Sequence, residues 1–239
     1  MTKRRIIFGL AGLAIGFIVA FTWTRSYNNN AMMAGSQPRS GGAGSAAPAG
    51  PASEQAGMAS VRETIERAKN NPNDYDAQLE AAKLYNQIGR MNEVVPLIER
   101  AYKINNARAV GDYIPLVLGQ YYSGQKDYAT AEKWFRAELD AKPKDSDTLI
   151  ELGASFIDRE PPVPDKAIDY LQSALKNNPN DAHALVHLTQ AYLQKKDARA
   201  AEDSLSRAKQ ADPSNKMIPD LEKQVSALRS GQQVILPKE

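Results

Sequence analysis

Apolar residues recur at intervals of three and four positions along most of the chain after residue 60. In the stretch LGQYYSGQKDYATAEKWFRAEL (118–139), this spacing is interrupted by SGQKD and then resumes until Pro143. Such spacing places apolar side chains on one face of an α-helix, and Gly and Pro are typical of helix ends. The pattern therefore predicts two amphipathic helices joined by a short turn, which is a helical hairpin.

The hairpin pattern is repeated along the chain. The pentapeptide NNPND begins at Asn70 and again at Asn177, an offset of 107 residues. Leu, Gly, Tyr or Phe, Ala and Pro recur at matching spacings between these points. They divide the chain into four units at 75–111, 112–145, 146–181 and 182–215. Self-similarity at this period predicts an α-solenoid, in which neighbouring hairpins share one core.

Small and bulky residues alternate within each unit. Gly119 and Ala131 are expected where two helices pack most closely, while Tyr122 and Phe135 fill the wider space beside them. A helix near 61–69 precedes the first unit, and apolar residues at helical spacing predict a capping helix at 217–229. The predicted domain spans 60–230, and a tail at 231–239 has no assigned role.

The N-terminal residues have a different pattern. Nineteen uncharged residues, IIFGLAGLAIGFIVAFTWT, lie between Arg5 and Arg25, so 1–25 is expected to be a transmembrane anchor. Three basic residues precede this run, which predicts a cytoplasmic N-terminus and an extracytoplasmic domain. The Gly-, Ala-, Ser- and Pro-rich segment 26–59 is expected to be a flexible, disordered linker. The alternative is a signal peptide cleaved near 31–34, which would give a secreted protein.

Charge and composition exclude several functions. The chain has 30 basic and 28 acidic residues and no cysteine, which argues against a nucleic-acid reader, a thiolate metal site or a Cys nucleophile. His183 and His187 are four residues apart, but HALVH lacks the Glu of a zincin motif, so no metal site is predicted. No catalytic motif is found. The sequence therefore predicts no enzyme activity and no cofactor.

The repeated motifs resemble those of the tetratricopeptide repeat (TPR) family, over about residues 75–215. In that family a 34-residue unit carries Leu-Gly and Tyr on its first helix, Ala and a bulky aromatic on its second, and Pro after it. Two positions depart from the family pattern, since Val94 and Glu138 stand where it has a small residue. The turn REPPVPDK (159–166) also lengthens the third unit.

The resemblance implies that the first helix of each unit lines a groove for a peptide or an amphipathic helix of a partner protein. The residues carried over to this groove are Leu79, Lys83, Asn86, Tyr113, Leu116, Gln120, Ile150, Ala154, Ile157, His183, Val186, Gln190 and Leu193. The alternative for the apolar members is packing against the next hairpin. A clamp for a C-terminal carboxylate is not expected, because Lys83 with Asn86 is the one suitable pair.

The combined hypothesis is a membrane-tethered adaptor, chaperone or scaffold in the cell envelope, with a periplasmic or otherwise extracytoplasmic domain. Membrane-anchored TPR proteins that hold apocytochromes during cytochrome c maturation are similar in layout, which implies one alternative function. A further alternative is a structural organiser that self-associates through the GxxxG of Gly12 and Gly16 or through its repeat surface, so a homo-oligomer is also considered. No nucleic-acid partner is expected.

Overall fold

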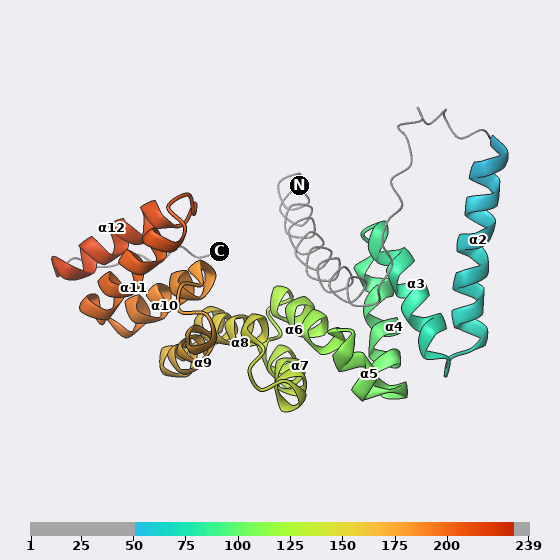
Figure 1. Ribbon diagram of the computed structural model, residues 1–239, viewed down its shortest axis with the longest axis horizontal. Coiled ribbons are helices and arrows are strands. Elements are labelled where there is room, and N and C mark those ends of the chain that lie inside the picture. The colour runs from blue at the N-terminus through green and yellow to red at the C-terminus, as the bar shows by residue number, and fades with distance from the viewer. Residues whose placement is uncertain (1–50, 232–239) are drawn as a thin grey trace, which may run out of the picture. The chain divides into compact units, whose positions relative to one another are not determined.

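The computed structural model describes residues 51–231 of the chain, with side chains described from residue 59 onward. This part contains eleven α-helices and no β-strand, which confirms the predicted all-α class for the described residues (Figure 1). The predicted membrane helix at 1–25 and most of the predicted linker and tail lie outside this range. Among the helices from 51 to 231, none is long and apolar enough to cross a bilayer.

The described residues divide into two compact units between Leu118 and Gly119, and the division falls inside helix α6. The described helices of the first unit are α2 (Pro51–Asn70), α3 (Tyr75–Gln87), α4 (Met91–Ile104), α5 (Asn106–Gly111) and the start of α6 (Ile114–Gly124). The second unit holds the rest of α6, then α7 (Tyr128–Ala141), α8 (Ser146–Asp158), α9 (Pro164–Asn177), α10 (Ala182–Lys195), α11 (Ala198–Ala211) and α12 (Ile218–Arg229).

In the first unit, α3 and α4 form a hairpin and α2 packs on α3. Gln78 joins these three helices, because its buried amide donates to the Ala68 carbonyl at 2.7 Å and accepts from Arg100 at 3.0 Å. Helix α2 begins at Pro51, earlier than the helix expected near 61–69. Residues 52–56 read ASEQA, which is compatible with a helix, although their Ala-rich composition continues that of the predicted linker.

The short helix α5 was not predicted. Arg108 of α5 pairs with Asp76 at 2.5 Å, and its guanidinium carbon lies 4.2 Å from the centre of the Tyr75 ring. The Tyr75 hydroxyl donates to Asp112 at 2.7 Å. Burial and this hydrogen bond both raise the pKa of Tyr75. These contacts hold α5 against the start of α3, and the extra helix accounts for the longer spacing between the first two repeats.

In the second unit, α8 with α9 and α10 with α11 form hairpins, and both α8 and α9 also pack against α10. Helix α7 packs on α8, while α12 packs on α11 and α10 at the position predicted for the capping helix. Four of these helices begin after an aspartate whose side chain accepts the backbone N–H three residues later. These N-cap residues are Asp127, Asp145, Asp181 and Asp197. The sequence therefore sets the helix starts locally, since a carboxylate satisfies an otherwise unpaired N–H.

The predicted close approach of helices is present at two glycines. A Cβ atom built on Gly119 would come closer than 3.0 Å to three ring carbons of Phe135, which is itself fully buried. A Cβ on Gly153 would lie 2.8 Å from Cγ of Leu171. Ala131 is also fully buried. The alternation of small and bulky residues therefore serves helix packing, as the sequence pattern indicated.

Glu138 is an exception in this core. Its side chain is fully buried where the family pattern has a small residue, and Lys142 pairs with its Oε1 at 2.8 Å. Its Oε2 has no hydrogen-bond partner. Burial raises the pKa of Glu138, and the hydrogen bond from Lys142 offsets only part of this effect. Folding therefore makes this carboxyl easier to protonate than it is in the unfolded chain.

We expect Glu138→Gln to reduce the pH dependence of stability above about pH 4.5, the ordinary pKa of a glutamate. Because the pKa of Glu138 is raised on folding, its stabilising contribution is present below the unfolded value and lost as the pH rises through the folded value. Each unit of upward shift corresponds to about 1.4 kcal/mol in the free energy of unfolding. Urea unfolding followed by circular dichroism at several pH values measures this effect.

Glu132→Gln is the matched control, because its carboxylate has the opposite shift. Burial alone would raise the pKa of Glu132, but hydrogen bonds from Arg136 and Arg159 lower it. Its contribution is present above the unfolded pKa and is lost as the pH falls, so this substitution should cost stability at neutral pH. If the free energy of unfolding depends on pH in the same way in both variants, the pKa of Glu138 is not raised on folding.

Candidate functional site

The residues predicted to line a groove fall on α3, α6, α8 and α10, apart from Tyr113, which directly precedes α6. In the first unit Leu79 and Leu116 are buried, whereas Lys83, Asn86 and Tyr113 are partly exposed. In the second unit His183 is exposed and Gln190 is partly exposed. The remaining members of the second unit are all buried: Gln120, Ile150, Ala154, Ile157, Val186 and Leu193.

Of the predicted groove residues, the aliphatic members are all buried, and so is the polar Gln120. The apolar side chains are at most 9% exposed, and α8 and α10, which carry five of them, pack against each other. They act as packing contacts in this conformation, which agrees with the structural alternative for those positions. The groove assignment itself stays a prediction, and its accessible members are polar.

A polar strip crosses this face of the second unit, and we define it as Gln120, Glu151, His183, His187 and Gln190. The Gln120 amide donates to Oε1 of Glu151 at 2.9 Å and so connects α6 to α8. Burial raises the pKa of Glu151, while Gln120 and His183 act in the opposite direction. The strip brings together three predicted groove residues and two further titratable groups.

The sequence analysis did not assign Glu151 to the groove. Its position in the helix could have indicated this residue. Glu151 lies three residues before Ala154, a predicted groove residue, and therefore on the same side of α8. Glu151 directly precedes the Leu-Gly pair of the repeat, whose members are buried.

The two histidines form a hydrogen-bonded pair within the strip. Nδ1 of His187 lies 2.8 Å from Oε1 of Gln190, and Nε2 of His187 lies 3.0 Å from Nε2 of His183. With Gln190 as acceptor, the His187 proton is on Nδ1, and its Nε2 accepts a hydrogen bond from His183. Burial and the neighbouring His183 lower the pKa of His187 to about 4, so this ring is neutral near pH 7.

Metal binding was not predicted for this pair. Within the described residues, no group of three or more His, Asp or Glu side chains is arranged to hold a metal ion. The histidines are already joined to each other and to Gln190, so their nitrogens serve a hydrogen-bond network.

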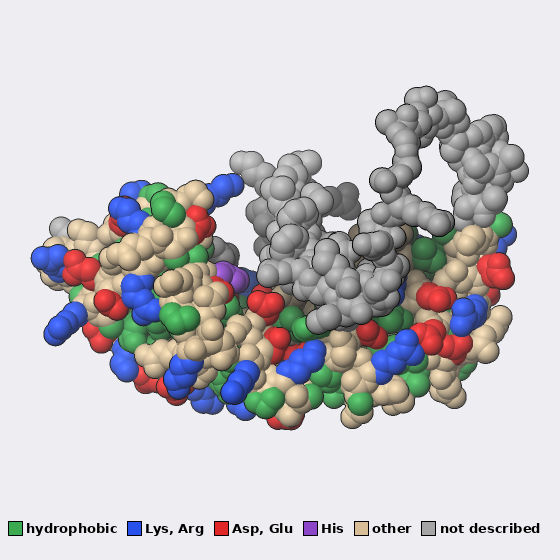
Figure 2. All heavy atoms as spheres, in the orientation of Figure 1, with side chains coloured by type: hydrophobic (Ala, Val, Ile, Leu, Met, Phe, Trp, Pro, Cys, Tyr) green, Lys and Arg blue, Asp and Glu red, His purple; other side chains and the backbone are tan. Residues whose placement is uncertain are grey.

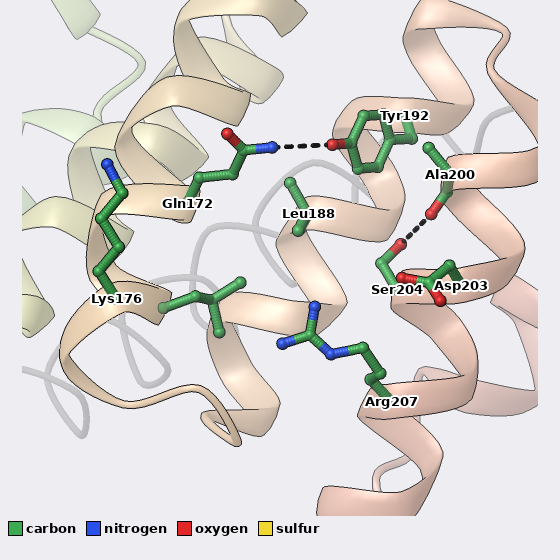
Figure 3. Close-up of a pocket in the computed structure, with 9 residues that line it drawn as sticks. Gln172, Lys176, Leu188, Tyr192, Ala200, Asp203, Ser204 and Arg207 are labelled. Atoms are coloured by element: carbon green, nitrogen blue, oxygen red, sulfur yellow. Dashed lines mark hydrogen bonds between the residues drawn. The ribbon is translucent and has the colours of Figure 1, made fainter.

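An open pocket of about 360 Å³ lies among α9, α10 and α11, and Figure 3 shows its lining. Gln172 donates to the Tyr192 hydroxyl at 3.0 Å, and Ser204 donates to the Ala200 carbonyl at 2.8 Å. None of the predicted groove residues lines it. The lining residues are Gln172, Leu175, Lys176, Leu188, Tyr192, Ala200, Asp203, Ser204 and Arg207.

The two ends of the Pro-rich turn REPPVPDK form ion pairs with neighbouring helices, while Glu160, Pro161 and Pro162 between them are exposed. Arg159 pairs with Glu132 of α7 at 3.2 Å, and its guanidinium carbon lies 3.8 Å from the centre of the Phe156 ring. Asp165 pairs with Lys195 of α10 at 2.6 Å. The Glu160–Pro161 peptide bond is cis. These contacts indicate a structural role for the turn within the second unit.

Charged side chains of both signs are interspersed over the described surface visible in Figure 2.

Comparisons with known proteins agree with this architecture. Residues 164–221 match the family model described as tetratricopeptide repeat, which covers α9 to α11 and the start of α12. Among solved structures, the crystal structure of YrrB, "a TPR protein with an unusual peptide-binding site", is similar, with a TM-score of 0.52 and 16% identity. The match covers 71% of this chain and 94% of YrrB, and at this identity it shows the fold alone. The search of curated proteins found no match.

Proposed function

We propose that this chain is a tetratricopeptide repeat protein, as the family match at 164–221 and the fold support, and that its second unit binds a peptide or an amphipathic helix of a partner protein along α8 and α10. The observation that carries the proposal is the polar strip. Hydrogen bonds join Gln120 of α6 to Glu151 of α8, and join His183, His187 and Gln190 along α10. Peptide recognition needs such polar groups to orient a ligand beside an apolar surface.

Two further observations support an interaction function rather than catalysis. The hairpins belong to a fold used for protein–protein interaction, and YrrB carries a peptide-binding site according to its description. The polar strip contains no Ser, Thr or Lys that could act as a nucleophile next to a base. The proposal extends to membrane tethering, on the strength of the uncharged run at 1–25, which would raise the local concentration of the module near membrane partners.

The proposal is tested by selecting a random peptide library on the full-length protein and measuring the affinity of the enriched peptides by fluorescence anisotropy. We expect His183→Ala combined with Gln190→Ala to weaken binding about tenfold, because two accessible polar contacts are removed. Gln172→Ala is the control, since Gln172 lines the separate pocket among α9, α10 and α11 and should leave binding unchanged.

If the enriched peptides bind the His183→Ala, Gln190→Ala double variant as tightly as the Gln172→Ala control, the site does not lie along α8 and α10. A library that yields no specific peptide would count against peptide capture as a whole. A stable homodimer in light scattering that dissociates on His183→Ala and Gln190→Ala would instead support the self-association alternative.

A further inference from the structure

Glu151 has a charge environment unlike that of the other partly or fully buried glutamates of the second unit. Glu138 is paired with Lys142 at 2.8 Å, and Glu132 is paired with both Arg136 and Arg159, at 2.9 Å and 3.2 Å. Glu151 forms no ion pair with any Lys, Arg or His among residues 59–231; its hydrogen bond comes from the neutral amide of Gln120.

The groups facing Glu151 do not neutralise it. Asp147 on the same helix raises the pKa of Glu151 further, and His183 on α10 is the one group able to carry positive charge that acts on this pKa. His183 is already joined to His187, which is neutral near pH 7. The strip contains no lysine or arginine. A carboxylate that is partly withdrawn from water and lacks a cation carries an electrostatic cost that an incoming cation would remove.

Glu151 is partly exposed, and one oxygen of its carboxylate has no donor among the described residues. Gln120 occupies Oε1, and no described residue donates to Oε2. His183 beside it is exposed, so the strip is open to solvent at this end. An ammonium or guanidinium group that approached from there would form a charge-assisted hydrogen bond, which is stronger than a bond between neutral groups.

We propose that Glu151 is the acceptor for a lysine or arginine side chain of the bound peptide, with Gln120 holding the carboxylate in place and His183 lining the entrance. This inference rests on the proposed peptide-binding function and adds the chemical class of the ligand. The partner segment is therefore a basic peptide, in contrast to the C-terminal carboxylate ligands for which the sequence offered few suitable residues.

The pH dependence of binding has a definite sign under this proposal. Burial raises the pKa of Glu151 in the free protein, and a bound cation favours the ionised carboxylate. Binding of a basic peptide therefore releases a proton when Glu151 is protonated beforehand. Affinity should increase as the pH rises through the free-state pKa of Glu151, and a peptide whose cation is replaced by a neutral group should not show this increase.

The test begins with a lysine-containing peptide selected on the full-length protein and a synthetic copy in which that lysine is replaced by norleucine. On the wild-type protein we expect the norleucine peptide to bind about tenfold more weakly, because the charge-assisted hydrogen bond is lost. On Glu151→Gln the two peptides should differ by less than about twofold. Asp203→Asn, in the separate pocket, should retain the wild-type difference and serves as the matched control.

The outcomes separate this inference from the proposed function. If peptides bind along α8 and α10 but norleucine costs nothing on the wild-type protein, Glu151 is not a cation acceptor, while the peptide-binding function stands. The same conclusion follows if Glu151→Gln keeps the full preference for lysine. If no peptide binds specifically, the proposed function fails and the inference fails with it. The norleucine comparison uses the wild-type protein, so it does not depend on the folding of a variant.

Discussion

Phe135→Ala is expected to lower the free energy of unfolding by about 3–5 kcal/mol. The Phe135 ring is fully buried in α7 and fills the space beside Gly119 of α6. Its removal leaves a cavity that the rigid helix backbones cannot close, so both the transfer free energy of the ring and its packing contacts are lost. Urea unfolding of the full-length protein, followed by circular dichroism, measures the effect.

Ile88→Ala is the control for this prediction. Ile88 is a large apolar residue of the first unit, but its side chain is 67% exposed. Its truncation should change stability by no more than about 0.5 kcal/mol, as for most surface substitutions. Because repeat arrays do not always unfold in one step, the midpoint and the slope of the transition are compared together. A small effect of Phe135→Ala would contradict its place in the core.

Gly119→Ala is expected to destabilise the protein by about 1–3 kcal/mol, although alanine is normally the better helix former. The added methyl group would overlap the Phe135 ring, and an aromatic ring enclosed on all sides has little room to move. The measurement is the same urea titration. Gly111→Ala is the control, because a Cβ at that position meets no atom within 4 Å and should be neutral or slightly stabilising.

A double variant tests whether Phe135 is the cause. In the background of Phe135→Ala, the overlap with Gly119→Ala is removed, so the glycine substitution should become neutral or stabilising. The two substitutions should therefore be strongly non-additive, as expected for residues in direct contact. Additive effects would show that Gly119 is required for another reason, such as the backbone conformation of α6.

Several features of the fold could be predicted from local sequence. The spacing of apolar residues indicated the hairpins, and the NNPND repeats indicated their period. The N-cap role of residues such as Asp145 and Asp181 depends on neighbours only three positions away. Helix α5 was missed, because its position depends on contacts of Arg108 with Tyr75 and Asp76, about thirty residues earlier in the chain.

The candidate site was less accessible to prediction. Family positions led to His183, Gln190 and Gln120, which the structure brings into one strip with Glu151 and His187. The same positions also included residues such as Val186, which is 1% exposed and packs inside the second unit. Helical register shows which residues share a face, but it does not show how deeply a neighbouring helix covers that face.

The amino-acid sequence by itself determined that this protein is built from helical hairpins with a repeat of about 36 residues, because helix formation, capping and turn chemistry depend on near neighbours. The tertiary structure decided which face of each helix stays accessible and which carboxylates acquire a cation. Glu132 and Glu138 are paired whereas Glu151 is not, and this difference arises from where α6, α7, α8 and α10 place their side chains in space. Burial and charge pairing depend on distances across the packed helices, and spacing along the chain does not contain them.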